Sequence, residues 1–149
     1  MAQYLYNKKV KFNYEILETL SAGIKLLGFE VKALKTKKGG SLEGSHIIIQ
    51  KGEAFLMGTH IPPYQPENTP KDYDSRRPRK LLFTKKELRK IIDNEATRGL
   101  TVVPISMYNK GNKIKVDVAI VRGKKKHDKR ETIKKRDVMR DVAREIKYR

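Results

Sequence analysis

The chain has 149 residues, which is enough for one domain with a short appendage. Its 35 Lys and Arg residues against 17 Asp and Glu residues give a net charge of +18, which indicates a polyanionic partner because such self-repulsion weakens a compact fold. The absence of Cys excludes disulfides and cysteine-ligated zinc, and no apolar run approaches the roughly 18 residues of a membrane span, so we expect a cytoplasmic protein without a membrane partner.

The first half of the chain predicts three strands and one helix. Residues 14–20 place apolar residues among acidic ones and predict a strand, whereas residues 29–37 have helical spacing with lysines on the outer side. The β-branched run at residues 46–50 is typical of a buried strand. The turn Lys51-Gly52 joins it to a second strand at residues 54–58, which predicts a hairpin.

A proline-rich segment divides this half from the next. Residues 62–80 contain five of the six prolines and predict a long irregular surface loop. Thr84 followed by Glu87 is a capping box that predicts a helix, with Gly99 at its end. We expect the inward stripe of this helix to contain Leu88, Ile91 and Ile92.

Two strands at residues 101–108 and 113–121 follow, joined by residues 109–112. The second strand alternates between a fully apolar face and a mixed face, which is the clearest strand pattern of the chain. Short antiparallel strands with hairpins and a few helices predict a mainly β fold, an OB-type antiparallel barrel with flanking helices, since such barrels bind nucleic acids. A mixed open sheet is the alternative.

The densest basic cluster of the barrel region is Arg76-Arg77-Pro78-Arg79-Lys80, at the end of the proline-rich loop. Guanidinium groups form paired hydrogen bonds with phosphate, so we expect Arg76, Arg77 and Lys80 to contact a nucleic-acid backbone. A solvated loop is the alternative.

A second candidate lies in the segment Gly28-Phe29-Glu30-Val31-Lys32, where Glu30 stands among lysines. Glu30 forms a surface ion pair of little energetic value, or it orients a basic side chain or accepts from a base amine. Lys32 is added as a backbone contact from its charge.

Metal and enzyme signatures are missing. His46, His60 and His127 have no metal-ligand spacing, and we expect His46 and His60 at the barrel edge. The chain has no phosphate-binding glycine loop and no nucleophile elbow. We therefore expect no cofactor, no metal and no catalysis.

Residues 124–149 form a basic tail with 12 Lys or Arg against 5 acidic residues. Its sparse apolar residues recur at helical spacing but bury little surface. We therefore expect a barrel domain at residues 1–123 and a tail that is disordered when free and helical against a polyanion. A purely solubilising tail is the alternative.

Taken together, several motifs resemble the small protein B family, whose members bind transfer-messenger RNA. They are Asn7-Lys8, Ala22-Gly23-Ile24, Gly28-Phe29-Glu30-Val31-Lys32, Gly52-Glu53-Ala54, Arg79-Lys80-Leu81-Leu82, Gly99-Leu100-Thr101-Val102-Val103-Pro104 and Gly123-Lys124-Lys125-Lys126-His127-Asp128-Lys129-Arg130. The resemblance implies an OB-type barrel that binds the tRNA-like domain of this RNA as a monomer. It also implies delivery of the RNA to the A site of stalled ribosomes, which tags unfinished proteins in trans-translation.

The resemblance also implies residue roles. It assigns RNA binding to Asn7, Glu30, Leu82 and Lys115, beside the contacts expected from charge at Lys32, Arg76, Arg77 and Lys80. It places His127 against 16S rRNA of the decoding centre and the tail as a helix in the mRNA channel. The ribosome-facing residues would be Lys124, Lys125, Lys126, His127, Asp128, Lys129 and Arg130.

Two other functions fit the charge. A general structured-RNA or ribosomal protein of OB type would show no preference for a tRNA-like fold. A module for anionic membranes is less favoured because the tail lacks a bulky aromatic face apart from Tyr148.

Overall fold

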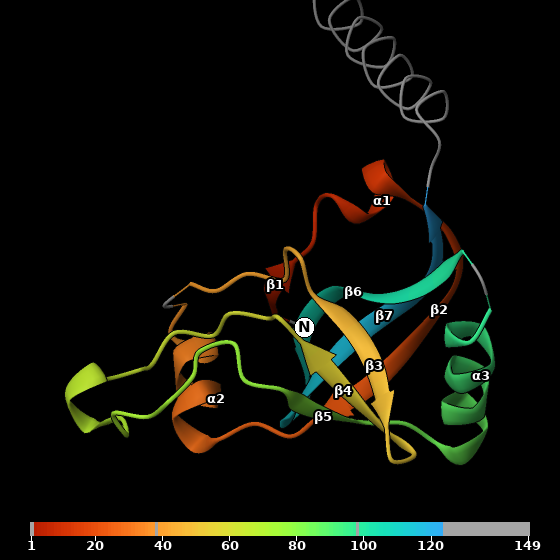
Figure 1. The fold of residues 1–149 in the computed structure, drawn as a ribbon. Helices are drawn as coiled ribbons and strands as arrows, with labels where there is room; N and C mark the ends of the chain where they lie inside the picture. The colour runs from red at the N-terminus through yellow and green to blue at the C-terminus, as the bar shows by residue number, and fades with distance from the viewer. Residues whose placement is uncertain (1, 38, 98, 124–149) are drawn as a thin grey trace, which may run out of the picture.

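The computed structural model describes residues 2–37, 39–97 and 99–123, and it contains one antiparallel sheet of seven strands in the order β1-β6-β7-β2-β5-β4-β3. Strand β3, at one end of this order, lies against β6, so the sheet curls into a barrel (Figure 1). This confirms the predicted mainly β, OB-type class. The strands are β1 (Gln3–Tyr6), β2 (Tyr14–Ile24), β3 (His46–Gln50), β4 (Glu53–Met57), β5 (Arg79–Leu82), β6 (Leu100–Lys110) and β7 (Lys113–Gly123).

Short helices flank the barrel. Helix α2 (Gly28–Lys35) and the proline-rich loop lie on one side and α3 (Lys85–Glu95) on the other, with α1 (Val10–Asn13) between β1 and β2 (Figure 1). A 3₁₀ turn, η1 (Pro66–Asn68), interrupts the loop. The predicted capping box of α3 is present, since the Glu87 amide donates to the Thr84 hydroxyl at 3.2 Å. None of the described helices is long and apolar enough to cross a membrane.

Both faces of β7 are apolar over part of its length. Val116 and Val118 belong to the main core inside the barrel. Ala119 and Val121 point the other way, yet they are also buried, in a second small cluster with Val10 of α1. The alternation predicted from sequence therefore holds, and the short helix α1 covers the outer face of β7 in its C-terminal half.

Several boundaries differ from the predictions. Strand β1 was not predicted, and β5 begins inside the segment expected to be irregular. The β6–β7 connection is a two-residue turn at Gly111-Asn112 and not a four-residue one, because Gly111 adopts φ 60° and allows a tight reversal. Helix α3 ends at Glu95, before Gly99, and its Ile92 is 39% exposed, so Ile92 is not part of the inward stripe.

Candidate RNA interface

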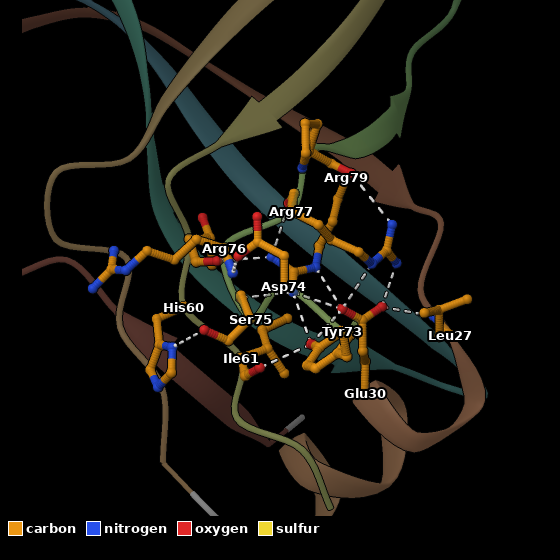
Figure 2. A network of polar contacts seen from close by, with 12 residues as sticks. Leu27, Glu30, His60, Ile61, Tyr73, Asp74, Ser75, Arg76, Arg77 and Arg79 are labelled. Carbon is orange, nitrogen blue, oxygen red and sulfur yellow. Dashed lines mark hydrogen bonds and ion pairs between the residues drawn. The ribbon is translucent and has the colours of Figure 1, made fainter. Parts of the chain in front are cut away.

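Glu30 is the centre of the most extensive polar network in the described part of the chain (Figure 2). It occupies the first turn of α2, where its Oε1 accepts the backbone N–H of the N-cap residue Leu27 at 2.8 Å. The side chain of Glu30 is fully buried. A buried carboxylate must be paired and hydrogen-bonded to be tolerated, so its partners decide the local structure.

Two arginines from the end of the proline-rich loop pair with this carboxylate. Arg79 is itself fully buried and donates from Nε and Nη2 to Glu30 Oε2 at 2.8 and 2.6 Å. Its remaining N–H groups reach backbone carbonyls, among them that of Thr59 at 2.7 Å. Arg77 pairs with Oε1 and donates from Nε to Oε2 at 3.2 Å, while 27% of its side chain stays exposed. The carboxylate thus binds α2 to the start of β5.

Tyr73, in the proline-rich loop, connects this loop to the Glu30 carboxylate. Its hydroxyl lies 2.9 Å from Glu30 Oε2 and 2.9 Å from the carbonyl oxygen of Ile61. The ring also meets that of Phe29 edge to face, with centroids 4.8 Å apart. Because Phe29 and Glu30 are neighbours on α2, one helical turn holds the loop through both apolar and polar contacts.

The pKa values of the network follow from these contacts. Burial raises the pKa of Glu30, but hydrogen bonds from Arg77, from the Leu27 backbone and from Arg79 outweigh it and hold that pKa below its usual value. Burial, followed by the hydrogen bond to the Glu30 carboxylate, raises the pKa of Tyr73 to about 12. At neutral pH the network therefore holds one carboxylate, two guanidinium groups and a neutral phenol.

The network leaves positive charge facing solvent. Arg76 is exposed, its side chain extends away from Glu30 (Figure 2), and its Nη1 donates to the Gly58 carbonyl at 2.8 Å. Two guanidinium groups share one buried carboxylate, so Arg77 contributes excess positive charge beside Arg76. Preorganised guanidinium groups of this kind are suited to phosphate.

A second feature is a row of paired residues across the outer face of three strands. Gly23 of β2 is paired with Leu82 of β5 on one side and with Lys115 of β7 on the other. Leu82 is 48% exposed and leans over Gly23, where an added Cβ would lie 3.5 Å from the leucine Cβ. Directly opposed residues share one face of the sheet, so Leu82, Gly23 and Lys115 form a row on the outer face. This row consists of an apolar side chain, a stretch of uncovered backbone and a cation.

The other predicted site residues lie apart from these two features. The Asn7 amide lies 3.4 Å from each of the Leu42 and Pro104 carbonyl oxygens, near α1. Lys32 is exposed on α2. Lys80 pairs with Glu53 at 2.9 Å across β5 and β4. The structure therefore brings Arg77 onto Glu30, with Arg76 next to Arg77 on the same loop, and it separately aligns Leu82 and Lys115 in one row.

Two expectations need correction. Glu30 does not form a surface ion pair and cannot accept from a base amine, because its side chain is buried and both oxygens are occupied. Arg79 does not belong to the exposed basic cluster, because β5 alternates and directs Arg79 and Leu81 inward and Lys80 and Leu82 outward. The sequence Arg-Lys-Leu-Leu does not alternate between polar and apolar residues, so it gave no indication of which face is inward. The partnership of Tyr73 with Glu30 left no signal in the sequence.

The tail residues from Lys124 to Arg130 lie outside the described residues. Within the described ranges no group of His, Asp and Glu side chains is arranged to hold a metal ion.

Comparison with known proteins places the chain in a family. The family model described as SmpB protein matches residues 4–148. An SsrA-binding protein of Mesoplasma florum is 49% identical over 142 residues, covering 95% of both chains. One of Microcystis aeruginosa is 45% identical over 141 residues, covering 95% of this chain and 91% of the relative.

A solved structure agrees with the sequence relatives. It is described as "tmRNA-SmpB: a journey to the center of the bacterial ribosome", and its matching chain is 38% identical with a TM-score of 0.68. The match covers 89% of this chain and 95% of the other. The chain therefore belongs to the SmpB protein family, the small protein B family that its motifs resemble.

Proposed function

We propose that the chain is an RNA-binding adaptor of trans-translation. It binds the tRNA-like domain of transfer-messenger RNA and delivers this RNA to the A site of stalled ribosomes. The observation that carries the proposal is the match to SsrA-binding proteins over 95% of the chain, in line with the ribosomal structure that its fold resembles. The charge of +18 supports a partner that is nucleic acid.

The Glu30 network supports a positioning role for that carboxylate in RNA binding. Glu30 is too deeply buried to touch RNA, but it fixes Arg77 and, through Tyr73, the loop that carries Arg76. Fixing these cations before the RNA arrives lowers the entropy cost of binding. Arg76 and the exposed part of Arg77 would then contact phosphates.

The outer row would provide a second contact. Lys115 offers a cation and Leu82 an exposed apolar surface beside Gly23, whose missing side chain lets a backbone or a base approach closely. Asn7 would act indirectly, because its side-chain amide holds the segment before α1 near the carbonyl oxygens of Leu42 and Pro104. Lys32 and Lys80 would add long-range attraction to the RNA.

Residues 1–123 would form the RNA-binding domain and residues 124–149 the part that acts on the ribosome. Residues Lys124 to Arg130 would contact 16S rRNA at the decoding centre, with the tail helical in the mRNA channel. In this scheme the protein is a cytoplasmic monomer that works by binding alone, without a cofactor or a catalytic step.

The proposal is tested by competition. Labelled tRNA-like domain of transfer-messenger RNA, bound to the full chain at near-physiological salt, is displaced by bulk tRNA, duplex RNA or DNA. We expect a preference of about tenfold or more for the tRNA-like domain, which corresponds to about 1.4 kcal/mol. Equal displacement by all competitors would instead favour a general structured-RNA protein.

The division of roles has its own test. Truncation after Gly123 should leave binding to the tRNA-like domain unchanged and abolish tagging in a reconstituted translation system. If truncation also removes binding, the tail and not the barrel holds the RNA.

A further inference from the structure

A cavity of about 350 Å³ lies between α2 and the β6–β7 turn, and none of its lining residues belongs to the Glu30 network. We propose that this cavity, called here the end pocket, receives one unstacked nucleotide of the bound RNA. The inference rests on the proposed function and adds a specific site to it. Ligand pockets in proteins span about 300–1,000 Å³, so the end pocket suits a single nucleotide and excludes a stacked helix.

The floor of the end pocket is apolar. It is formed by Ile24 and Leu26 after β2, Val31 of α2 and Ile114 of β7. Three of them, Ile24, Leu26 and Ile114, are only partly buried and rest on the main core, so their outer surfaces remain available. Flipped bases are commonly held against apolar side chains, and this floor provides such a surface.

The rim carries positive charge without compensation. Lys35 of α2 and Lys113 of β7 border the cavity, and no acidic residue lines it among the described residues. Neither ammonium group has a hydrogen-bond or ion-pair partner in the part of the chain that the structure describes. A nucleotide phosphate at the rim would supply the missing counter-charge.

The lysine at the turn is unfavourable without such a ligand. Lys113 is paired directly with Lys110 across the β6–β7 hairpin. Like charges in directly opposed positions destabilise a strand pair. A phosphate bound between the two ammonium groups would accept hydrogen bonds from both and offset their repulsion. Phosphate binding would therefore explain why two lysines are paired at this turn.

Two amides complete the lining. The Oδ1 of Asn109 accepts the backbone N–H of Ala2 at 2.5 Å, which orients its side chain and leaves its NH₂ group to donate elsewhere. Asn112 at the turn adds a second amide that both donates and accepts. Amides can pair with base edges, so the pocket combines an apolar surface with base-reading groups.

The rim of the end pocket shares a face with the outer row, whereas its floor residues Ile24 and Ile114 face the main core. Lys113 precedes Lys115 by two residues on β7, so both side chains lie on the same face. RNA that contacts Leu82–Gly23–Lys115 would need only a short turn of its backbone to place a nucleotide in the pocket. Charge complementarity and continuity with this surface favour RNA over a protein segment as the occupant.

The experiment uses full-length protein with ¹³C-labelled methyl groups and the tRNA-like domain of transfer-messenger RNA. We expect nuclear Overhauser contacts from the Val31 and Ile114 methyl groups to protons of one nucleotide. Bound RNA without any contact to these methyl groups would overturn the inference and leave the proposed function standing. Failure of the wild-type chain to bind this RNA would instead overturn both.

Variants test the same site through affinity. The double variant Lys35→Ala and Lys113→Ala should weaken RNA binding and lower the salt-dependence slope by about 2. Lys85→Ala with Lys86→Ala, on α3 across the barrel, removes equal charge and should not change the slope. An equal change in slope for both double variants would refute the inference, because it would show that total charge, and not contact at the pocket rim, sets the salt dependence.

A steric variant keeps the charge constant. Val31→Phe fills the floor of the end pocket and should lower RNA affinity about tenfold with an unchanged salt slope, which is the scale of one lost stacked base. Ile92→Phe, at an exposed position on α3, is the matched control and should bind as the wild type does. Unchanged affinity in a folded Val31→Phe variant, checked by circular dichroism, would contradict occupancy of the pocket.

Discussion

Replacement of Glu30 by Ala tests whether a buried ion cluster fixes the loop. The change removes the acceptor of Arg77, Arg79 and Tyr73 together, and it leaves the fully buried guanidinium of Arg79 without its counter-charge. Breaking a buried pair by removing one partner costs about 3–5 kcal/mol, because the remaining charge stays desolvated. Total stability of such domains is about 5–15 kcal/mol, so the loss is a large fraction of it.

The assay is chemical denaturation followed by circular dichroism, with Glu43→Ala as the matched control. Glu43 also pairs with a cation, Lys9 at 2.5 Å, but both side chains are 63% exposed. Removal of an exposed pair has little effect on stability, so Glu43→Ala should unfold as the wild type does. An equally small effect of Glu30→Ala would refute the reasoning, since it would mean that the buried charges are hydrated.

The same variant separates positioning from direct contact in RNA binding. We expect Glu30→Ala to bind the tRNA-like domain more weakly under conditions in which it remains folded, although it removes a negative charge. Affinity that rises or holds would show that the order of the loop is irrelevant to binding.

Three further predictions concern the same region. The folded-state pKa of Glu30 lies below the ordinary value of 4.5 for a glutamate, so the stabilisation by its charge is present above pH 4.5 and is lost as the pH falls toward the lower folded pKa. Glu30→Gln should therefore make the free energy of unfolding less dependent on pH in the acid range. The pKa of Tyr73 is raised from 10.0 to about 12, so its stabilisation is present below pH 10 and lost as the pH rises to about 12. Tyr73→Phe should remove this loss of stability at alkaline pH. It should also remove the tyrosine that ionises late in an absorbance titration of the tyrosine side chains, and an unchanged titration would contradict the buried phenol. Gly40→Ala would place a Cβ 2.8 Å from the His60 carbonyl oxygen, whereas a Cβ at Gly39, which also has a positive φ, has no atom of the described residues within 4 Å. In urea unfolding, Gly40→Ala should therefore lower the free energy of unfolding by about 1–3 kcal/mol more than Gly39→Ala does, and equal losses would refute the clash.

The sequence determined the local elements of the fold. The capping box at Thr84, the hairpin residues Lys51-Gly52 and the alternation along β7 each depend on contacts a few residues apart. Such signals are readable because helix caps, tight turns and strand alternation impose their own residue types. Strand β1 left little signal because it has four residues and a bulge.

The binding chemistry was only partly readable. Net charge and the basic cluster pointed to a polyanion such as nucleic acid, and the spaced motifs pointed to the family and to RNA. Charge alone could not distinguish Arg79 from Arg76, although one is buried and the other exposed. That difference depends on which face of β5 meets the core.

What only the tertiary structure decided is which distant residues meet. Glu30 lies 43 residues from Tyr73 and 49 from Arg79, yet one carboxylate joins all three. Leu82 and Lys115 share one row only because both are paired with Gly23 of β2, which lies between their strands. Helices, turns and strands are readable from sequence because their stabilising interactions act within a few residues. The pairing of distant charged residues, and the alignment of residues from different strands in one row, depend instead on how the closed sheet brings these elements together.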